Sequence, residues 1–119
     1  MSKITVYQKP TCTTCRNVYQ ALKESGVDFD AVNYYVTPIP KTKLRELIKK
    51  MGLSAFDILR KKDDIYKELG LAAKELSEEE LVDLMVRHPD LIERPIVERG
   101  ARAILARPAD KIKDFLKSK

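Results

Sequence analysis

Two cysteines, Cys12 and Cys15, are the residues whose type and spacing most directly indicate chemistry. They stand in Cys-Thr-Thr-Cys, after a short apolar segment and at the expected start of a helix. The first turn of a helix presents unpaired N–H groups and the positive end of the helix dipole, which stabilise a thiolate and lower the thiol pKa. We therefore expect Cys12 to be the exposed nucleophile. Cys15, one turn along the same face, would resolve the adduct as a Cys12–Cys15 disulfide.

The cysteine pair has two alternative explanations. A structural zinc ion needs four ligands, whereas the chain offers two cysteines and one histidine, His88, so a metal site is not expected. Two inert buried thiols remain the other alternative. The N-terminal segment has no export signal, which predicts a cytoplasmic protein. In that reducing compartment a close cysteine pair more often serves redox chemistry than structure.

Several residues near the pair and elsewhere could hold an anion. Thr14 lies in the expected first helical turn, where backbone N–H groups bind anions readily, and Arg16 adds a positive charge. Arg60, Arg94 and Arg107 stand among apolar residues, and the guanidinium fork matches the oxygens of a tetrahedral oxyanion. Taken singly, each of these three arginines is better explained as a surface ion-pair partner.

The elements that must position these residues begin with a strand, a helix and a strand. The apolar, partly β-branched residues 4–7 predict a buried strand, and residues 13–25 predict a helix that Gly26 ends. Residues 30–35 are a second strand candidate. This order favours a parallel crossover unit.

Helical periodicity then dominates residues 41–88, where Ser77 and Glu80 form a capping box. Strands are expected at 95–98 and 102–105, followed by a helix over 108–117. The predicted fold class is therefore α/β. It has a thioredoxin-like core (β-α-β … β-β-α) formed by residues 1–40 and 89–119, with residues 41–88 as an inserted helical subdomain of one domain, 1–119.

Composition excludes several classes of protein. The chain has 119 residues, 44% hydrophobic and 34% charged, which suits one globular domain and argues against disorder. It lacks an apolar run of the ~20 residues that a membrane helix needs. The net charge of +5 comes from dispersed residues with little aromatic interleaving, so direct nucleic-acid binding is not expected.

Taken together, these motifs resemble the arsenate reductase family called ArsC, the glutaredoxin-coupled type with a thioredoxin fold. The resemblance covers essentially the whole chain. The matching stretches are Pro-x-Cys-x-x-x-Arg-Asn (10–17), Leu59-Arg60-Lys61, Glu68-Leu69-Gly70-Leu71, His88-Pro89, Arg94-Pro95-Ile96-Val97 and Arg107-Pro108.

The resemblance implies a role for each of these residues. Cys12 would attack arsenate, and Arg60, Arg94 and Arg107 would surround the arsenic centre. The Arg94–Pro95 bond would be cis, with Pro95 facing Cys12. The implied reductant is thioredoxin, glutaredoxin or glutathione, and neither a metal nor an organic cofactor is implied.

Two positions depart from the family pattern. Gln8 stands where the family commonly has a histidine, and glutamine can hydrogen-bond but cannot titrate. Cys15 stands where the single-cysteine reductases typically have serine. The adduct on Cys12 could therefore collapse to an internal disulfide that thioredoxin or glutaredoxin resets.

The Cys-x-x-Cys also resembles a sister branch, the Spx-type transcription regulators, which bind the RNA polymerase alpha subunit. Arg107-Pro108 resembles the reductase pattern instead and favours an enzyme. A third alternative is a general thiol–disulfide oxidoreductase that has no oxyanion substrate.

Overall fold

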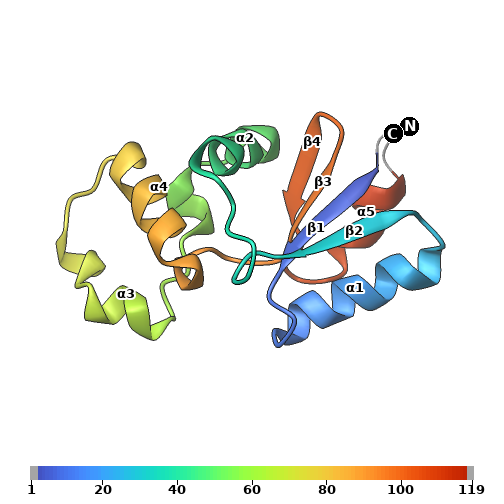
Figure 1. Cartoon of the computed structure of the whole chain (residues 1–119), viewed down its shortest axis with the longest axis horizontal. Helices are drawn as coiled ribbons and strands as arrows, with labels where there is room; N and C mark the ends of the chain where they lie inside the picture. The colour runs from blue at the N-terminus through green and yellow to red at the C-terminus, as the bar shows by residue number, and fades with distance from the viewer. Residues whose placement is uncertain (1–2, 118–119) are drawn as a thin grey trace. The chain divides into compact units, whose positions relative to one another are not determined.

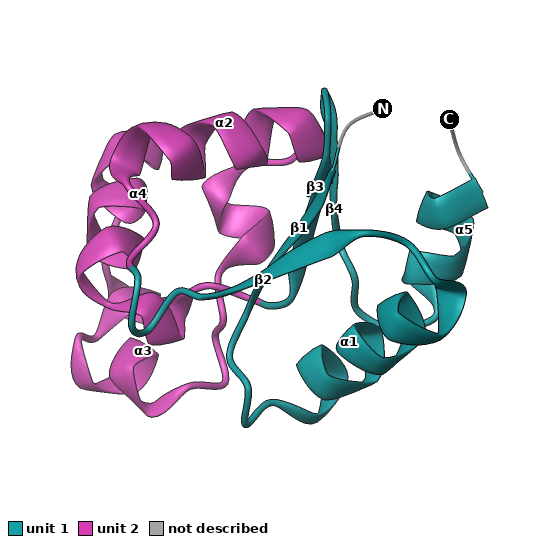
Figure 2. Cartoon of the chain, turned by 45° about the vertical axis from the view of Figure 1, so that its right-hand side comes forward, with its two compact units in different colours: residues 1–37, 94–119 teal, residues 38–93 magenta. Residues whose placement is uncertain are grey.

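The structure is a computed structural model that describes residues 3–117. These residues form two compact units (Figure 2), one comprising the chain up to Thr37 together with the chain from Arg94, the other Pro38–Glu93. The second unit is inserted between two strands of the first. The insert predicted from the sequence, residues 41–88, begins and ends a few residues inside the bounds of this second unit.

A four-stranded sheet with two helices makes up the first unit (Figure 1). The strand order is β2-β1-β3-β4, in which β1 and β2 are parallel while β3 runs antiparallel to both β1 and β4. This is the predicted thioredoxin-like α/β topology. Its elements are β1 (Ile4–Gln8), α1 (Thr13–Ser25), β2 (Phe29–Asn33), β3 (Ile96–Arg99), β4 (Arg102–Leu105) and α5 (Lys111–Lys117).

The core of the first unit lies between one face of the sheet and the helices α1 and α5. Alternate strand residues point to this face because the side-chain period of a strand is two. Burial of this layer fixes α1, and therefore the turn before it, against β1. The buried residues of the layer are Ile4, Val6, Val18, Leu22, Val97, Ala106, Ile112 and Phe115.

The second unit is helical, as its periodicity predicted. Ser77 begins α4 with the predicted capping box, since its side chain accepts from the Glu80 N–H and the Glu80 side chain accepts from the Ser77 N–H. The unit comprises α2 (Lys41–Met51), α3 (Asp64–Glu68), α4 (Glu78–Arg87) and three short 3₁₀ helices, η1 (Ala55–Ile58), η2 (Leu71–Ala73) and η3 (Pro89–Leu91). Within residues 3–117, none of the helices combines the length and the hydropathy that crossing a lipid bilayer requires.

The end of β2 differs from the prediction. The strand was expected to continue to residue 35, but it ends at Asn33, whose side chain accepts a hydrogen bond from the Tyr35 N–H at 3.0 Å. The Val36 and Thr37 N–H groups both bond the Asn33 carbonyl, which closes a turn. An asparagine that competes for backbone donors in this way ends a strand despite the β-favouring aromatics that follow it.

The capping box predicts a measurable contribution of Ser77 to stability. Ser77→Ala removes the side-chain acceptor and should lower the free energy of unfolding by about 1 kcal/mol in urea titrations. Ser77→Thr keeps the hydroxyl and is the matched control. Equal losses in the two variants would contradict the assignment of the effect to the cap.

Candidate functional site

Cys12 occupies the N-cap position of α1. Its backbone is extended (φ −79°, ψ 128°), and its sulfur accepts a hydrogen bond from the Cys15 N–H at 3.5 Å. Its own N–H donates to the Lys9 carbonyl, and its carbonyl accepts from the Arg16 N–H, both at 2.9 Å. The sulfur thus takes the place that a serine or aspartate oxygen usually fills at a helix start.

The environment of Cys12 lowers its pKa from 9.0 to about 7. Partial burial by itself would raise the pKa, but the Cys15 N–H, the Cys15 side chain and the Arg94 guanidinium together outweigh it. Hydrogen bonds and a positive charge both favour the ionised form. A large fraction of Cys12 is therefore thiolate at neutral pH, and thiolate is the nucleophilic form.

Cys15 behaves in the opposite way. Its side chain is fully buried, and burial, together with the neighbouring Cys12 sulfur, raises its pKa to about 12. Both cysteines are free thiols in this structure. The pair therefore consists of an accessible, acidic thiol and a buried, protonated one.

Four segments of the first unit reach one edge of its sheet, and each carries one part of the site. The turn after β1 carries Cys12, and the turn after the parallel β2 carries Tyr35. Arg94 precedes the antiparallel β3, and Arg107 follows β4. The strand register brings these segments together, with the edge pairs Gln8 and Asn33, Tyr7 and Ile96, and Ile96 and Leu105.

Two of the three predicted arginines surround the Cys12 sulfur. Arg107 Nη1 lies 4.0 Å from Cys12 Sγ, and the same nitrogen donates to the Arg94 carbonyl at 3.0 Å. Arg94 is 5% exposed and helps to lower the pKa of Cys12. The Arg94–Pro95 bond is cis, as is the Arg107–Pro108 bond, which the sequence analysis did not anticipate. Two guanidinium groups thus stand where an attacking sulfur would meet an anion.

Arg60 lies in the other compact unit. Its Nη1 contacts Glu93 Oε1 at 3.1 Å, and its Nε lies 3.8 Å from Asp63 Oδ2. Its backbone N–H donates to the Leu91 carbonyl at 2.8 Å. Two carboxylates therefore already offset its charge, and its predicted contact with an anion at Cys12 stays a prediction.

Sequence reasoning missed the residues around Arg94. Arg94 Nη1 donates to the Tyr35 hydroxyl at 3.3 Å, and Lys9 Nζ lies 4.7 Å from the centre of the Tyr35 ring. Tyr34 is 1% exposed, and its ring centre lies 5.1 Å from that of Tyr35. Their position after a strand parallel to β1 was the available indication, since parallel strands end at the same edge.

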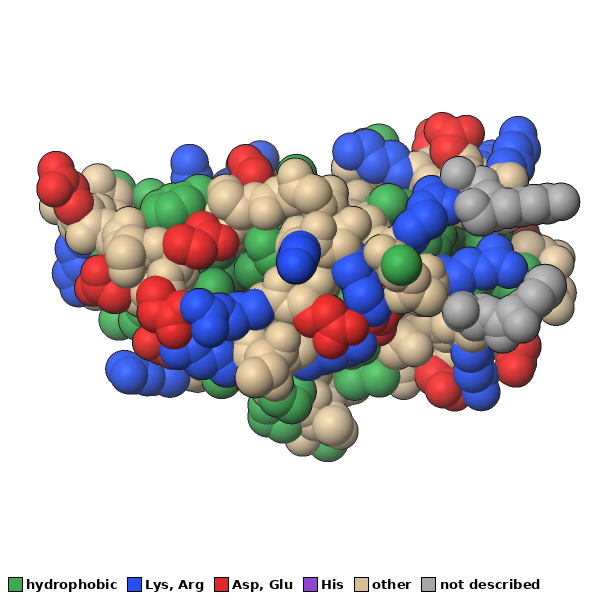
Figure 3. Space-filling view, turned by 90° about the horizontal axis from the view of Figure 1, so that it is seen from above, with side chains coloured by type: hydrophobic (Ala, Val, Ile, Leu, Met, Phe, Trp, Pro, Cys, Tyr) green, Lys and Arg blue, Asp and Glu red, His purple; other side chains and the backbone are tan. Residues whose placement is uncertain are grey.

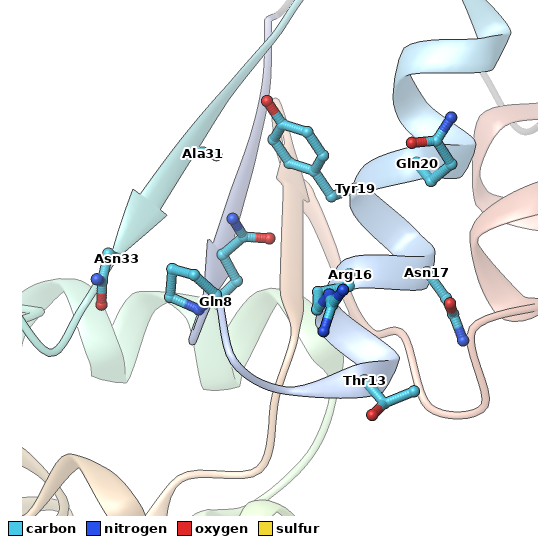
Figure 4. A pocket seen from close by; sticks show the side chains of 9 residues that line it. Gln8, Thr13, Arg16, Asn17, Tyr19, Gln20, Ala31 and Asn33 are labelled. Atoms are coloured by element: carbon cyan, nitrogen blue, oxygen red, sulfur yellow. The ribbon is translucent and has the colours of Figure 1, made fainter.

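A pocket of about 800 Å³ borders the first turns of α1 (Figure 4). Arg16 and Thr13 line it from the helix, and Gln8 lines it from the end of β1. Gln8 is 8% exposed, and its Oε1 has no hydrogen-bond partner among the described residues. Thr14, in the same helical turn, is half-buried. The predicted roles of Thr14 and Arg16 in binding a substrate stay predictions.

Charged side chains are distributed over the surface. On the face seen in Figure 3, basic and acidic side chains are interspersed rather than gathered into one basic stripe.

Comparison with known proteins finds a match to the ArsC family over residues 7–115. The uncharacterized protein YfgD of Escherichia coli K12 is 40% identical over 115 residues, 96% of this chain and 97% of that protein. An arsenate reductase of Escherichia coli is 40% identical over 116 residues, 98% of this chain and 82% of that protein. The solved arsenate reductase from Vibrio cholerae has a TM-score of 0.89 at 31% identity, covering 95% of this chain and 97% of that one.

The unequal thiols predict how alkylation depends on pH. The rate of Cys12 modification by iodoacetamide should rise with pH around a midpoint of about 7, while Cys15 stays unmodified in the folded protein. Arg94→Ala should move the midpoint upward, because it removes a positive charge from the thiolate. Arg99→Ala, at the opposite end of β3, is the matched control. A midpoint near 9 in the unaltered protein would refute the acidic thiol.

Proposed function

Because the chain belongs to the ArsC family, we propose that it is a thiol-based reductase whose Cys12 thiolate attacks an oxyanion, arsenate being the leading candidate. The observation that carries the proposal is the pair of guanidinium groups, Arg94 and Arg107, beside an acidic sulfur. The similarity to arsenate reductases over nearly the whole chain supports the choice of substrate.

The first step forms a bond between sulfur and arsenic. The Cys12 thiolate donates its electron pair to As(V), and one oxygen of the arsenate leaves as water after protonation. Arg94 and Arg107 neutralise negative charge on the remaining oxygens. Fixed donors of this kind typically contribute a few kcal/mol each to the stabilisation of a transition state.

Cys15 is proposed to complete the reduction. Its sulfur attacks the Cys12 sulfur, so that an S–S bond forms, the S–As bond breaks, and its electron pair reduces As(V) to As(III). The thiolate of Cys12 is one of the causes that raise the pKa of Cys15. Once Cys12 is bonded to arsenic that negative charge is gone, and Cys15 becomes easier to ionise at the moment it must act.

An external thiol protein, thioredoxin or glutaredoxin, is proposed to return the two electrons by reducing the Cys12–Cys15 disulfide. Arg60 is proposed as the third cationic ligand of the oxyanion. Because Glu93 and Asp63 already contact it, we expect its substitution to weaken substrate binding less than that of Arg94.

A second candidate is general thiol–disulfide exchange. The contrast between a Cys12 pKa of about 7 and a Cys15 pKa of about 12 favours it, since an acidic attacking thiol and a protonated partner serve any disulfide substrate equally well. Dependence on the arginines separates the two candidates, because a neutral disulfide needs no cationic ligands.

The reductase proposal predicts arsenate-dependent oxidation of NADPH in an assay coupled to thioredoxin and thioredoxin reductase, or to glutaredoxin, glutathione and glutathione reductase. Cys12→Ser should abolish turnover, and Arg94→Ala should lower kcat/KM about 100-fold or more. Arg87→Ala, an exposed arginine at the end of α4, is the control. A rate of disulfide reduction that is unchanged by the arginine substitutions would favour the second candidate. A lack of turnover, with capture of the RNA polymerase alpha subunit, would favour the regulator alternative.

The internal disulfide predicts a specific defect in Cys15→Ser. In this variant Cys12 should still attack arsenate, but the reaction should stop at the arsenic adduct in the thioredoxin-coupled assay, which intact-mass spectrometry would detect. The unaltered protein mixed with arsenate should instead lose two hydrogens as the disulfide forms. Because Cys15 is fully buried, Cys15→Ala serves as a second variant, with circular dichroism as a check on folding. Full thioredoxin-coupled turnover in both variants would exclude Cys15 as the resolving thiol.

A further inference from the structure

Arg94 has a demanding position for a cationic side chain. It is 5% exposed, and its Nε is buried without a hydrogen-bond partner among the described residues. Its Nη1 donates to the Tyr35 hydroxyl at 3.3 Å, and its carbonyl accepts from Arg107 Nη1 at 3.0 Å. A long, flexible side chain loses considerable rotamer entropy when it is fixed. A contact is therefore needed to hold the Arg94 guanidinium in one position.

Tyr35 is itself held from two sides. Lys9 Nζ lies over its ring, 4.7 Å from the centre, and the buried Tyr34 ring lies 5.1 Å away at a tilt of 39°. Its backbone N–H donates to the Asn33 side chain at 3.0 Å. Ring, backbone and hydroxyl are thus all engaged, which makes Tyr35 a rigid support at the edge of the sheet.

We propose that Tyr35 is a positioning residue, which holds the Arg94 guanidinium at the Cys12 sulfur together with the Tyr34 side chain, while Lys9 lies over the Tyr35 ring. It acts through Arg94 and does not touch the reacting atoms. Arg107 is held separately, because its Nη1 bonds the Arg94 main-chain carbonyl and lies 4.0 Å from Cys12 Sγ. The consequence for anion binding rests on the proposed function, whereas the consequence for the Cys12 thiol does not.

The groups that bear on the charge of Cys12 come from each neighbouring segment. The helix supplies Cys15, and the loops beside β3 and β4 supply Arg94 and Arg107, whereas Lys9 and Arg16 contact Cys12 through their main chains. Of these groups, Tyr35→Phe directly alters Arg94 alone, which loses its hydrogen bond to the Tyr35 hydroxyl. The substitution removes one oxygen and leaves the ring that contacts Lys9 and Tyr34, so a change at Cys12 must pass through Arg94.

The test is the pH profile of Cys12 alkylation in Tyr35→Phe, with thiolate absorbance at 240 nm as a second readout. A lost hydrogen bond of ordinary strength should move the profile upward by about half a pH unit, or about threefold less thiolate at pH 6. In the coupled assay, the KM for arsenate should rise between about twofold and tenfold, while the KM for thioredoxin should be unchanged.

Two tyrosines provide matched controls. Tyr19→Phe removes a hydroxyl from a ring of α1 that is 37% exposed and packs against Phe29, and Tyr7→Phe removes a buried hydroxyl that donates to Glu98 at 3.1 Å. Neither should move the profile, although Tyr7→Phe should lower the thermal midpoint. A Tyr35→Phe profile that superimposes on that of the unaltered protein would overturn the proposal, as would an equal shift in Tyr19→Phe. A shifted profile in a protein that does not turn over arsenate would support the positioning role of Tyr35 and would exclude arsenate as the substrate.

Discussion

The hydrogen bond from the Cys15 N–H to the Cys12 sulfur is the interaction on which the rest of the site depends. Helix α1 begins at that sulfur, so the side chain that caps the helix is also the nucleophile. Sulfur is a weaker acceptor than the oxygens that usually cap helices, and ionisation makes it a stronger one. The helix therefore gains a better cap when Cys12 ionises, and the thiolate gains the N–H group and the dipole. Local structure and reactivity are coupled in one contact.

The sheet register explains how residues far apart in the sequence converge on this contact. Because β2 is parallel to β1, the turns that follow both strands lie at one edge. Because β3 is antiparallel to β1 and β4 is antiparallel to β3, the start of β3 and the end of β4 reach that same edge. A shift of register by one residue would turn the buried layer outward and also separate the arginines from the sulfur. The core and the site therefore constrain each other.

Local patterns were enough to predict most of the elements. Helix α1 begins directly after Cys12 and ends at Gly26, whose φ of 75° is in the left-handed region. Both boundaries could be predicted from the local sequence. The capping box of α4 is likewise a local signature. The end of β2 was predicted wrongly because a single side-chain acceptor, Asn33, outweighed the strand propensity of two tyrosines. Competition of this kind depends on the geometry of a few atoms rather than on periodicity.

The supporting contacts of the site could not be predicted for a different reason. Arg94, Arg107 and Cys12 were identified by residue type and by family resemblance, which indicate which groups carry chemistry. The contacts of Tyr35 with Arg94 and Lys9 join segments that only the folded sheet brings together. No spacing rule connects residues 9, 35 and 94. The contact of Arg60 with Glu93 could not be predicted either, since the two residues are far apart in the sequence.

The environment of Cys12 also explains why Gln8 can stand where the family commonly has a titrating histidine. A neighbouring base is useful when the thiol would otherwise be protonated at neutral pH. Here the Cys15 N–H, the Cys15 side chain and Arg94 overcome the cost of burial and bring the pKa of Cys12 to about 7. The thiolate already forms without a base, and Gln8 adds no second titration near neutrality. The rise of reactivity with pH should then follow a single ionisation, that of Cys12 itself, whereas a histidine at position 8 would add its own.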